Sequence, residues 1–174
     1  MNRLIAFCLI ALFLVSSCQK KEESKMQTPF PNNSMELQNK IVQLEGLVKQ
    51  NPKNLNAWIE LGNSFMDSSR FPEAVNAYQK ALDMSPNNVD VRVDLGTCYR
   101  SAGQPEKAAE EYRKAISTDP RHANAHRNLG IVLAFDLKDK QGAIKELEKY
   151  LSLAPNAPDS QKISGLVTEL RKPA

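Results

Sequence analysis

The sequence is poor in the residues on which enzyme sites and disulfide scaffolds most often depend. Of its 174 residues only three are cysteine, two are histidine and seven are glycine. Three cysteines cannot build a disulfide scaffold, and two histidines leave little for acid–base or metal chemistry. Charge is nearly balanced, with 23 Lys and Arg against 20 Asp and Glu and no basic block, which argues against dedicated nucleic-acid binding. We therefore expect a non-enzymatic protein with one modest domain and no cofactor or metal.

The one long apolar run lies at the N-terminus. Residues 4–15 are all apolar and follow Arg3, the only charge before them. As a helix they would rise about 18 Å, which is short of the roughly 30 Å of a bilayer core. This length is typical of the apolar part of a signal peptide, and the small residues Ser16 and Ser17 follow it where a signal peptidase would cut.

The string from Leu14 to Cys18 resembles a bacterial lipobox, in which an aliphatic residue and small residues precede a cysteine. The resemblance implies a lipoprotein signal peptide at 1–17, cleavage before Cys18, and acylation of the Cys18 thiol. Two or three acyl chains hold a protein on a membrane far better than one. The alternative is an ordinary secretory signal with a cysteine near the cut by chance.

Residues 18–34 have little apolar content and no periodicity, so we expect a disordered tether behind the lipid anchor. Gln19 stands where lipoproteins retained at the inner membrane of enteric bacteria carry an aspartate. The resemblance therefore favours a periplasm-facing protein on the outer membrane. The outer leaflet of the inner membrane and the cell surface stay open as alternatives.

From residue 55 the sequence repeats itself at an interval of 34 residues, a period typical of helical arrays. Spacings of three and four within each unit predict two amphipathic helices. Glycines in the middle of the first helices indicate that a second helix crosses closely, with Ala74 and Ala81 expected to supply the small facing surface. The repeat-defining core positions are Trp58, Leu61, Gly62, Ala74, Tyr78, Ala81, Leu95, Gly96, Ala108, Tyr112, Leu129 and Gly130.

These positions resemble the tetratricopeptide repeat (TPR), and the first unit matches its motif at every main position. The later units depart from it: Arg92 and His126 replace the tryptophan, Leu147 the tyrosine, and Tyr150 a small alanine. The resemblance implies an all-α fold, a right-handed superhelix with repeats at 55–88, 89–122 and 123–157. One extra residue falls within 135–142 of the third repeat.

Both flanks of the repeats fit a helical solenoid. An apolar stripe predicts a degenerate half-repeat helix at 35–52, with Ser34 as its N-cap. Another stripe predicts a C-terminal capping helix at 158–172, which would cover the apolar end of the array.

Few residues of the repeats could carry chemistry. His122 and His126 are four apart and could hold a metal together with Asp119. We favour a solvated loop histidine and a histidine that fills the tryptophan position. Cys98 is expected to be a packed thiol, although a reactive one stays open, and Glu110 and Glu111 are expected on the surface.

The concave face that the TPR resemblance implies is the candidate peptide-binding groove. Several of its residues are apolar where a solvated face would be charged, so we expect a protein or peptide partner. The alternative is that they pack between adjacent helices. The candidate residues are Asn56, Ile59, Asn63, Met66, Val93, Thr97, Arg100, Asn124, Arg127 and Ile131, with Asp90, Ala134 and Phe135 beside them.

The family's carboxylate clamp is absent, because Ile59, Asp94 and Asn128 stand at its positions. Docking of chaperone C-termini is therefore not expected. The whole sequence favours a membrane-anchored scaffold or assembly factor of the bacterial cell envelope. A self-associating structural TPR protein without a client peptide is the alternative.

Overall fold

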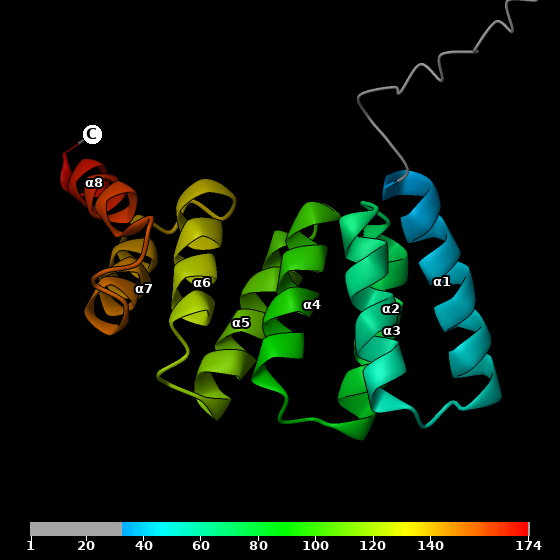
Figure 1. Ribbon diagram of the computed structural model, residues 1–174. Helices are drawn as coiled ribbons and strands as arrows, with labels where there is room; N and C mark the ends of the chain where they lie inside the picture. The colour runs from blue at the N-terminus through cyan, green and yellow to red at the C-terminus, as the bar shows by residue number, and fades with distance from the viewer. Residues whose placement is uncertain (1–32, 174) are drawn as a thin grey trace, which may run out of the picture. The chain divides into compact units, whose positions relative to one another are not determined.

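The computed structural model describes residues 33–173, and this part of the chain forms eight α-helices and no strand (Figure 1). The predicted signal peptide, Cys18 and the predicted tether up to residue 32 lie outside the described residues. The helices are α1 (Asn33–Gln50), α2 (Leu55–Asp67), α3 (Phe71–Met84), α4 (Val89–Ser101), α5 (Pro105–Thr118), α6 (Ala123–Phe135), α7 (Lys140–Leu153) and α8 (Ser160–Arg171).

The helices of residues 33–173 pack in chain order. The pairs α2–α3, α4–α5 and α6–α7 make the most extensive contacts, and neighbouring pairs stack side by side (Figure 1). Helix α1 packs on α2 at one end, and α8 packs on α7 at the other. The prediction of an all-α solenoid of helix–turn–helix units with flanking helices is confirmed.

Short local signals fix where the helices of each unit begin and turn. The first helices start behind a side chain that accepts a hydrogen bond from a backbone N–H, as expected of N-caps. These caps are Asn54, Asn88 and His122. Each turn to the second helix holds one residue in the left-handed region: Ser69 at φ 59°, Gly103 at φ 74° and Lys138 at φ 59°. The extra residue of the third unit is thus absorbed in its turn.

Helix α1 differs from its predicted bounds. It begins at Asn33 and ends at Gln50, whereas the apolar stripe predicted 35–52. Ser34 therefore lies inside the first turn, and the prediction that it caps the helix is wrong. The apolar stripe could not fix this end, because N-terminal turns carry side chains that need no burial.

The glycines in the first helices do mark close crossings, but alanines do not fill them. A Cβ atom on Gly62 would lie 2.6 Å from Cε1 of Tyr78, so the tyrosine ring itself occupies the notch. Tyr112 covers Gly96 and Leu147 covers Gly130 at the same separation. The atoms nearest to the notch at Gly62 thus belong to Tyr78 and not to Ala74 or Ala81, which are both buried in the core. A large side chain at the crossing requires the space that a missing Cβ leaves, whereas a small side chain requires it less.

The position of the repeat tryptophan has one constant partner, the carbonyl of the proline that closes the preceding unit. Trp58 Nε1 donates to the Pro52 carbonyl at 2.9 Å, and Arg92 Nη2 donates to the Pro86 carbonyl at 2.6 Å. In the third unit, Nε2 of His126 lies 3.1 Å from the carbonyl oxygen of Pro120. Three different side chains thus make the same link between a loop and a helix.

In the second and third units this side chain also meets a carboxylate. Arg92 Nη1 donates to Glu111 at 2.7 Å, and Nδ1 of His126 lies 2.6 Å from Glu146. Glu111 is only 9% exposed, so its predicted place on the surface is wrong. It is drawn inward because a buried cation requires an acceptor. Both ring nitrogens of His126 thus lie within hydrogen-bond distance of an oxygen, one of Glu146 and one of Pro120.

We predict that Gly62→Ala destabilises the protein. Alanine in a helix is favoured over glycine by about 1 kcal/mol, but its methyl group would collide with the Tyr78 ring. The ring cannot move away freely, because the Tyr78 hydroxyl donates to Asn63 Oδ1 at 2.6 Å. Overpacking of this kind costs about 1–3 kcal/mol, measured as the free energy of unfolding in urea.

The matched control for this prediction is Gly46→Ala in α1, where a Cβ would meet nothing within 4 Å. This variant should be as stable as the original or more stable. Equal effects of the two substitutions would contradict a close crossing at Gly62.

Candidate functional site

A cleft of about 380 Å³ opens at the C-terminal end of the first-helix face, between α4, α6 and α8. Its apolar wall is formed by Ile131, Phe135, Ile163 and Leu166. Phe135 is 52% exposed, whereas Ile163 is 4% exposed and belongs to the core. The cleft therefore offers an apolar surface that the fold leaves accessible at its rim.

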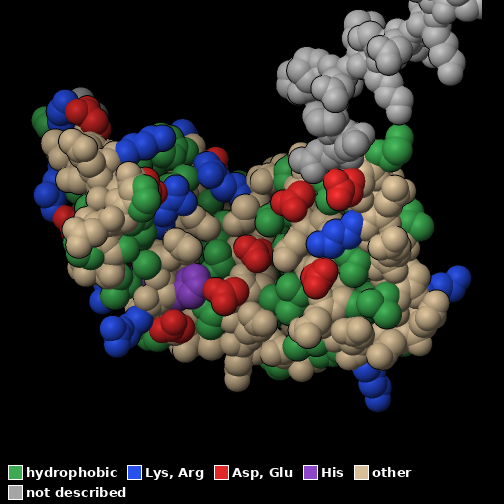
Figure 2. All heavy atoms as spheres, in the orientation of Figure 1, with side chains coloured by type: hydrophobic (Ala, Val, Ile, Leu, Met, Phe, Trp, Pro, Cys, Tyr) green, Lys and Arg blue, Asp and Glu red, His purple; other side chains and the backbone are tan. Residues whose placement is uncertain are grey.

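Three cations and two acids surround this apolar wall. The cations are Arg100, Arg127 and Lys162, and all three line the cleft. Arg100 Nε donates to Asp136 at 2.6 Å, and Arg127 Nε donates to Asp159. Figure 2 shows basic side chains gathered over the α6–α8 end of this face, and acidic side chains over its α1–α4 part.

Asp159 joins the cleft to the last repeat. Its carboxylate accepts from the Tyr150 hydroxyl as well as from Arg127, and these hydrogen bonds, that of Tyr150 first, hold the pKa of Asp159 below its usual range. Asp159 is also the residue that precedes α8. The start of the capping helix is thus fixed to the groove side of α6.

The cleft brings together only some of the predicted groove residues. Arg100, Arg127 and Ile131 line it together with Phe135. The remaining predicted residues lie along α2, α4 and the first turn of α6. Asn56 and Asn124 are exposed, whereas Ile59, Asn63, Met66 and Thr97 are half-buried.

Two of these groove residues serve the repeat itself. Asn63 accepts from the Tyr78 hydroxyl at 2.6 Å, and Thr97 lies 3.1 Å from the Tyr112 hydroxyl. Both tyrosines are buried, so these hydrogen bonds satisfy hydroxyls that water cannot reach.

Val93 does not line an open groove. It is 6% exposed and belongs to the main hydrophobic core, so its predicted exposure on the concave face is wrong. Helix α4 is the middle one of the three first helices (Figure 1), and it packs mainly on α3 and α5. Ile59 and Met66 also pack against that core, but remain partly exposed.

An acidic cluster occupies the first half of α4. Nε2 of His122 lies 2.9 Å from Oδ1 of Asp90. Burial, and next the charge of Asp90, raise the pKa of Asp94 to about 6, while His122 opposes the shift. The centre of the first-helix face is therefore unfavourable for a further negative charge.

The two histidines have separate structural partners. His122 caps α6 and is half-buried, so its prediction as a solvated loop residue is wrong. A free ring nitrogen at this position is drawn to the nearby backbone N–H. His126 is 5% exposed and fills the tryptophan position. Among residues 33–173 no group of three or more His, Cys, Asp or Glu side chains could hold a metal ion.

Cys98 is fully buried at 0% exposure. Burial, followed by the charge of Asp94, raises the pKa of its thiol to about 12. Since the thiolate is the reactive form, this environment suits a packing residue.

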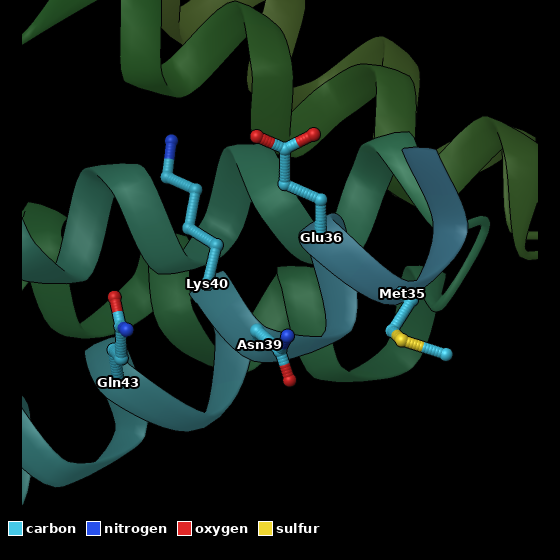
Figure 3. Close-up of a pocket in the computed structure, with 5 residues that line it drawn as sticks. All are labelled: Met35, Glu36, Asn39, Lys40 and Gln43. Carbon is cyan, nitrogen blue, oxygen red and sulfur yellow. The ribbon is translucent and has the colours of Figure 1, made fainter. Parts of the chain in front are cut away.

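A second hollow, of about 680 Å³, lies on α1 (Figure 3). Its described lining residues all belong to this helix and are all exposed: Met35, Glu36, Asn39, Lys40 and Gln43. Glu36 and Lys40 extend to the same side of the helix, and Lys40 Nζ lies 3.5 Å from Glu60. The hollow is shallow and polar, and we do not assign it a function.

Sequence reasoning missed the carboxylates that organise this face and the contribution of α8. Glu111 and Glu146 occupy the position that Ala77 holds in the first unit, once the extra residue is counted. The signal available in the sequence was an acid at this position together with Arg92 or His126 at the tryptophan position of the same unit. No repeat position predicts Asp159, because it precedes a helix outside the repeats.

The fold and its groove define a helical-repeat scaffold of the TPR class. The sequence matches the family described as cytochrome c-type biogenesis protein H TPR domain over residues 19–161, and the chain belongs to this family. TPR proteins are protein–protein interaction scaffolds. No curated protein matches the chain.

Solved structures share the fold. A crystal structure of MamA protein matches with a TM-score of 0.71 at 21% identity, covering 79% of this chain and 75% of that one. The Sgt2 TPR domain from Aspergillus fumigatus matches with a TM-score of 0.62 at 25% identity, covering 69% of this chain and 85% of that one. None of the helices between residues 33 and 173 is both long and apolar enough to span a membrane.

We predict that Asp94→Asn stabilises the protein increasingly as the pH rises. The folded-state pKa of Asp94 lies above its ordinary value, so ionisation is unfavourable in the folded protein. The wild type therefore loses stability as the pH rises from about 4 through about 6, and asparagine does not. Thermal unfolding at about pH 4 and about pH 8 measures the difference in Tm, which should be larger at the higher pH.

Asp83→Asn is the control, since this carboxylate is exposed on α3. A difference in Tm that stays the same at both pH values for Asp94→Asn would contradict the raised pKa.

Proposed function

We propose that this protein is a lipid-anchored TPR lipoprotein of the bacterial cell envelope, which binds a protein or peptide partner and acts as a scaffold or assembly factor. Cys18 would carry the lipid, the solenoid would face the periplasm, and the outer membrane is the favoured location. The observation that carries the binding function is the accessible apolar wall of the cleft, with arginines at its rim, on a TPR solenoid.

The sequence around Cys18 supports the anchor. The match to the TPR family begins at residue 19, directly behind this cysteine, so the apolar run and the lipobox-like string lie outside the family domain. An acylated N-terminus is consistent with this division, because cleavage before Cys18 would leave the whole of the family match in the mature chain.

The family supports an assembly role. Its name refers to cytochrome c-type biogenesis, in which a protein is matured rather than a small molecule converted. A scaffold that holds one protein segment while another component acts on it needs a groove and no catalytic group of its own. The cleft between α4, α6 and α8 fits this requirement.

Self-association is the second candidate function, and the exposed side chains of α1 favour it. Met35, Val42 and Leu47 are 71%, 57% and 41% exposed, and they account for three of the four exposed large apolar side chains of residues 33–173. Helix α1 is the first helix of the described array, so a second copy could extend the stack there.

For the anchor we predict that Cys18→Ser releases the protein from the membrane fraction and abolishes incorporation of labelled fatty acid. Loss of the thiol removes the only site for the acyl chains, each of which contributes about 0.8 kcal/mol per buried CH₂. Cys8→Ser is the matched control, because Cys8 lies within the predicted signal peptide. Unchanged labelling of Cys18→Ser would refute the lipoprotein assignment.

For the partner we predict that crosslinking and affinity purification from intact cells recover a protein whose yield falls strongly in Phe135→Asp. A charge at this rim position opposes burial of an apolar side chain in the cleft. Val42→Asp is the matched control, because Val42 is similarly exposed on α1. Both variants should fold, since both side chains are largely in water.

The same purification separates the two candidate functions. Loss of a foreign protein in Phe135→Asp alone supports binding in the cleft. Recovery of only untagged copies of the chain, with loss in Val42→Asp, would support self-association and contradict the client-binding function.

A further inference from the structure

The cleft between α4, α6 and α8 has a chemistry that selects among protein segments. Its volume of about 380 Å³ lies at the lower end of ligand sites, which span about 300–1,000 Å³. Such a space accepts about one or two side chains, not a folded domain. Its wall is aliphatic and aromatic, so the side chain that enters it must be apolar.

The rim carries more positive than negative charge. Three cations line it and two of them have a carboxylate partner, which leaves Lys162 exposed and without an ion pair among residues 33–173. Arg100 and Arg127 are 38% and 36% exposed at their side chains, so both guanidinium groups can still be reached from solvent.

The internal acids leave the ends of the guanidinium groups available. Asp136 takes the Nε–H of Arg100, and Asp159 takes the Nε–H of Arg127. A guanidinium carries five N–H donors, and its paired terminal donors match the two oxygens of a carboxylate. Arg127 gives one further donor to Asn128 at 3.2 Å. The remaining N–H groups of the two guanidinium groups are therefore held in a fixed orientation and can still donate to a ligand.

The charges on the rest of the first-helix face determine where the carboxylates of a bound segment can lie. Asp90 and Asp94 on α4 and Glu60 on α2 would repel an acidic segment, and Figure 2 shows several acidic side chains on this face away from its α6–α8 end. A bound segment therefore gains by placing its carboxylates at the cleft, where Arg100, Arg127 and Lys162 lie.

We infer that this cleft binds an acidic segment of a partner protein, in which a bulky apolar side chain is flanked by carboxylates. The apolar side chain packs on Phe135, Ile131 and Leu166, and the flanking carboxylates meet the termini of Arg100 and Arg127 and the ammonium group of Lys162. The inference rests on the proposed function, because it names the chemistry of the partner that the scaffold holds.

The test uses the purified full-length chain in detergent and dye-labelled peptides, with fluorescence anisotropy as the readout. The probe is acetyl-Gly-Ser-Glu-Phe-Glu-Ser-Gly-amide, labelled on an added cysteine. One comparison peptide carries lysine in place of both glutamates, and another carries glycine in place of phenylalanine. We expect the probe to bind at least about tenfold more tightly than either comparison peptide.

Variants of the chain locate the binding site. Lys162→Glu and Phe135→Ser should each weaken binding of the probe by about tenfold. Their matched controls are Arg113→Glu on α5 and Val42→Ser on α1, which change other exposed side chains away from the cleft and should leave the affinity unchanged. Thermal unfolding of each variant verifies that it is folded.

Equal affinity for the glutamate and lysine peptides, or equal effects of Lys162→Glu and Arg113→Glu, would overturn the inference. That result is distinguishable from failure of the proposed function. A client that is captured from cells and lost in Phe135→Asp, but without affinity of the cleft for the acidic probe, would preserve the scaffold and reject this chemistry.

Discussion

Each helix pair depends on one contact, in which a bulky side chain of the second helix lies directly over a glycine of the first. The ring of Tyr78 over Gly62 sets the distance between α2 and α3, and the later units reproduce it with Tyr112 and Leu147. The residues of the first helix beside this contact face the second helix of the same unit, and those on its other side face the groove. In the first two units the tyrosine hydroxyl reaches across to Asn63 or Thr97, so the notch and the groove surface are coupled through one side chain. The third unit has Leu147 and Ile131 instead, and its groove surface is correspondingly apolar at the cleft.

The fold follows from the sequence because its signals recur at a constant interval, so each unit supports the interpretation of the others. Leucine–glycine and the closing proline return in all three units and the tyrosine in the first two, and a helix pair is the structure that accommodates all of them. Individual contacts were less predictable. The alanines expected at the crossing were consistent with a close approach, but periodicity cannot distinguish a small surface from a ring that enters the notch. The cleft could not be predicted for a related reason. Ile131 and Arg127 were identified from the repeat, but Asp159 and Lys162 lie beyond the repeats, where the repeat register does not predict which residues come together.

The tryptophan position shows how the repeat tolerates a change of chemistry. Arg92 meets Glu111 and His126 meets Glu146, at the position where the first unit has Ala77, while Trp58, Arg92 and His126 each still reach the carbonyl of a preceding proline. A buried arginine without its acid would be strongly destabilising, so Arg92 depends on Glu111. Such pairs add little net stability over an apolar pair of similar volume. They are directional, however, and each links the first helix of its unit to the second.

Helix α8 has two roles, and both depend on the same short helix. It covers the apolar end of the last repeat with Ile163 and Val167, and it forms one wall of the cleft with Lys162 and Leu166. Asp159, at its start, binds Arg127 and Tyr150 together, so the helix that closes the core also orients a rim arginine. An arginine held by an internal carboxylate has already lost much of its rotamer freedom, and a ligand that meets it loses less on binding. The same carboxylate lowers the net positive charge of the rim. The cleft therefore favours a ligand whose carboxylates match the orientation of the donors over one that only brings negative charge.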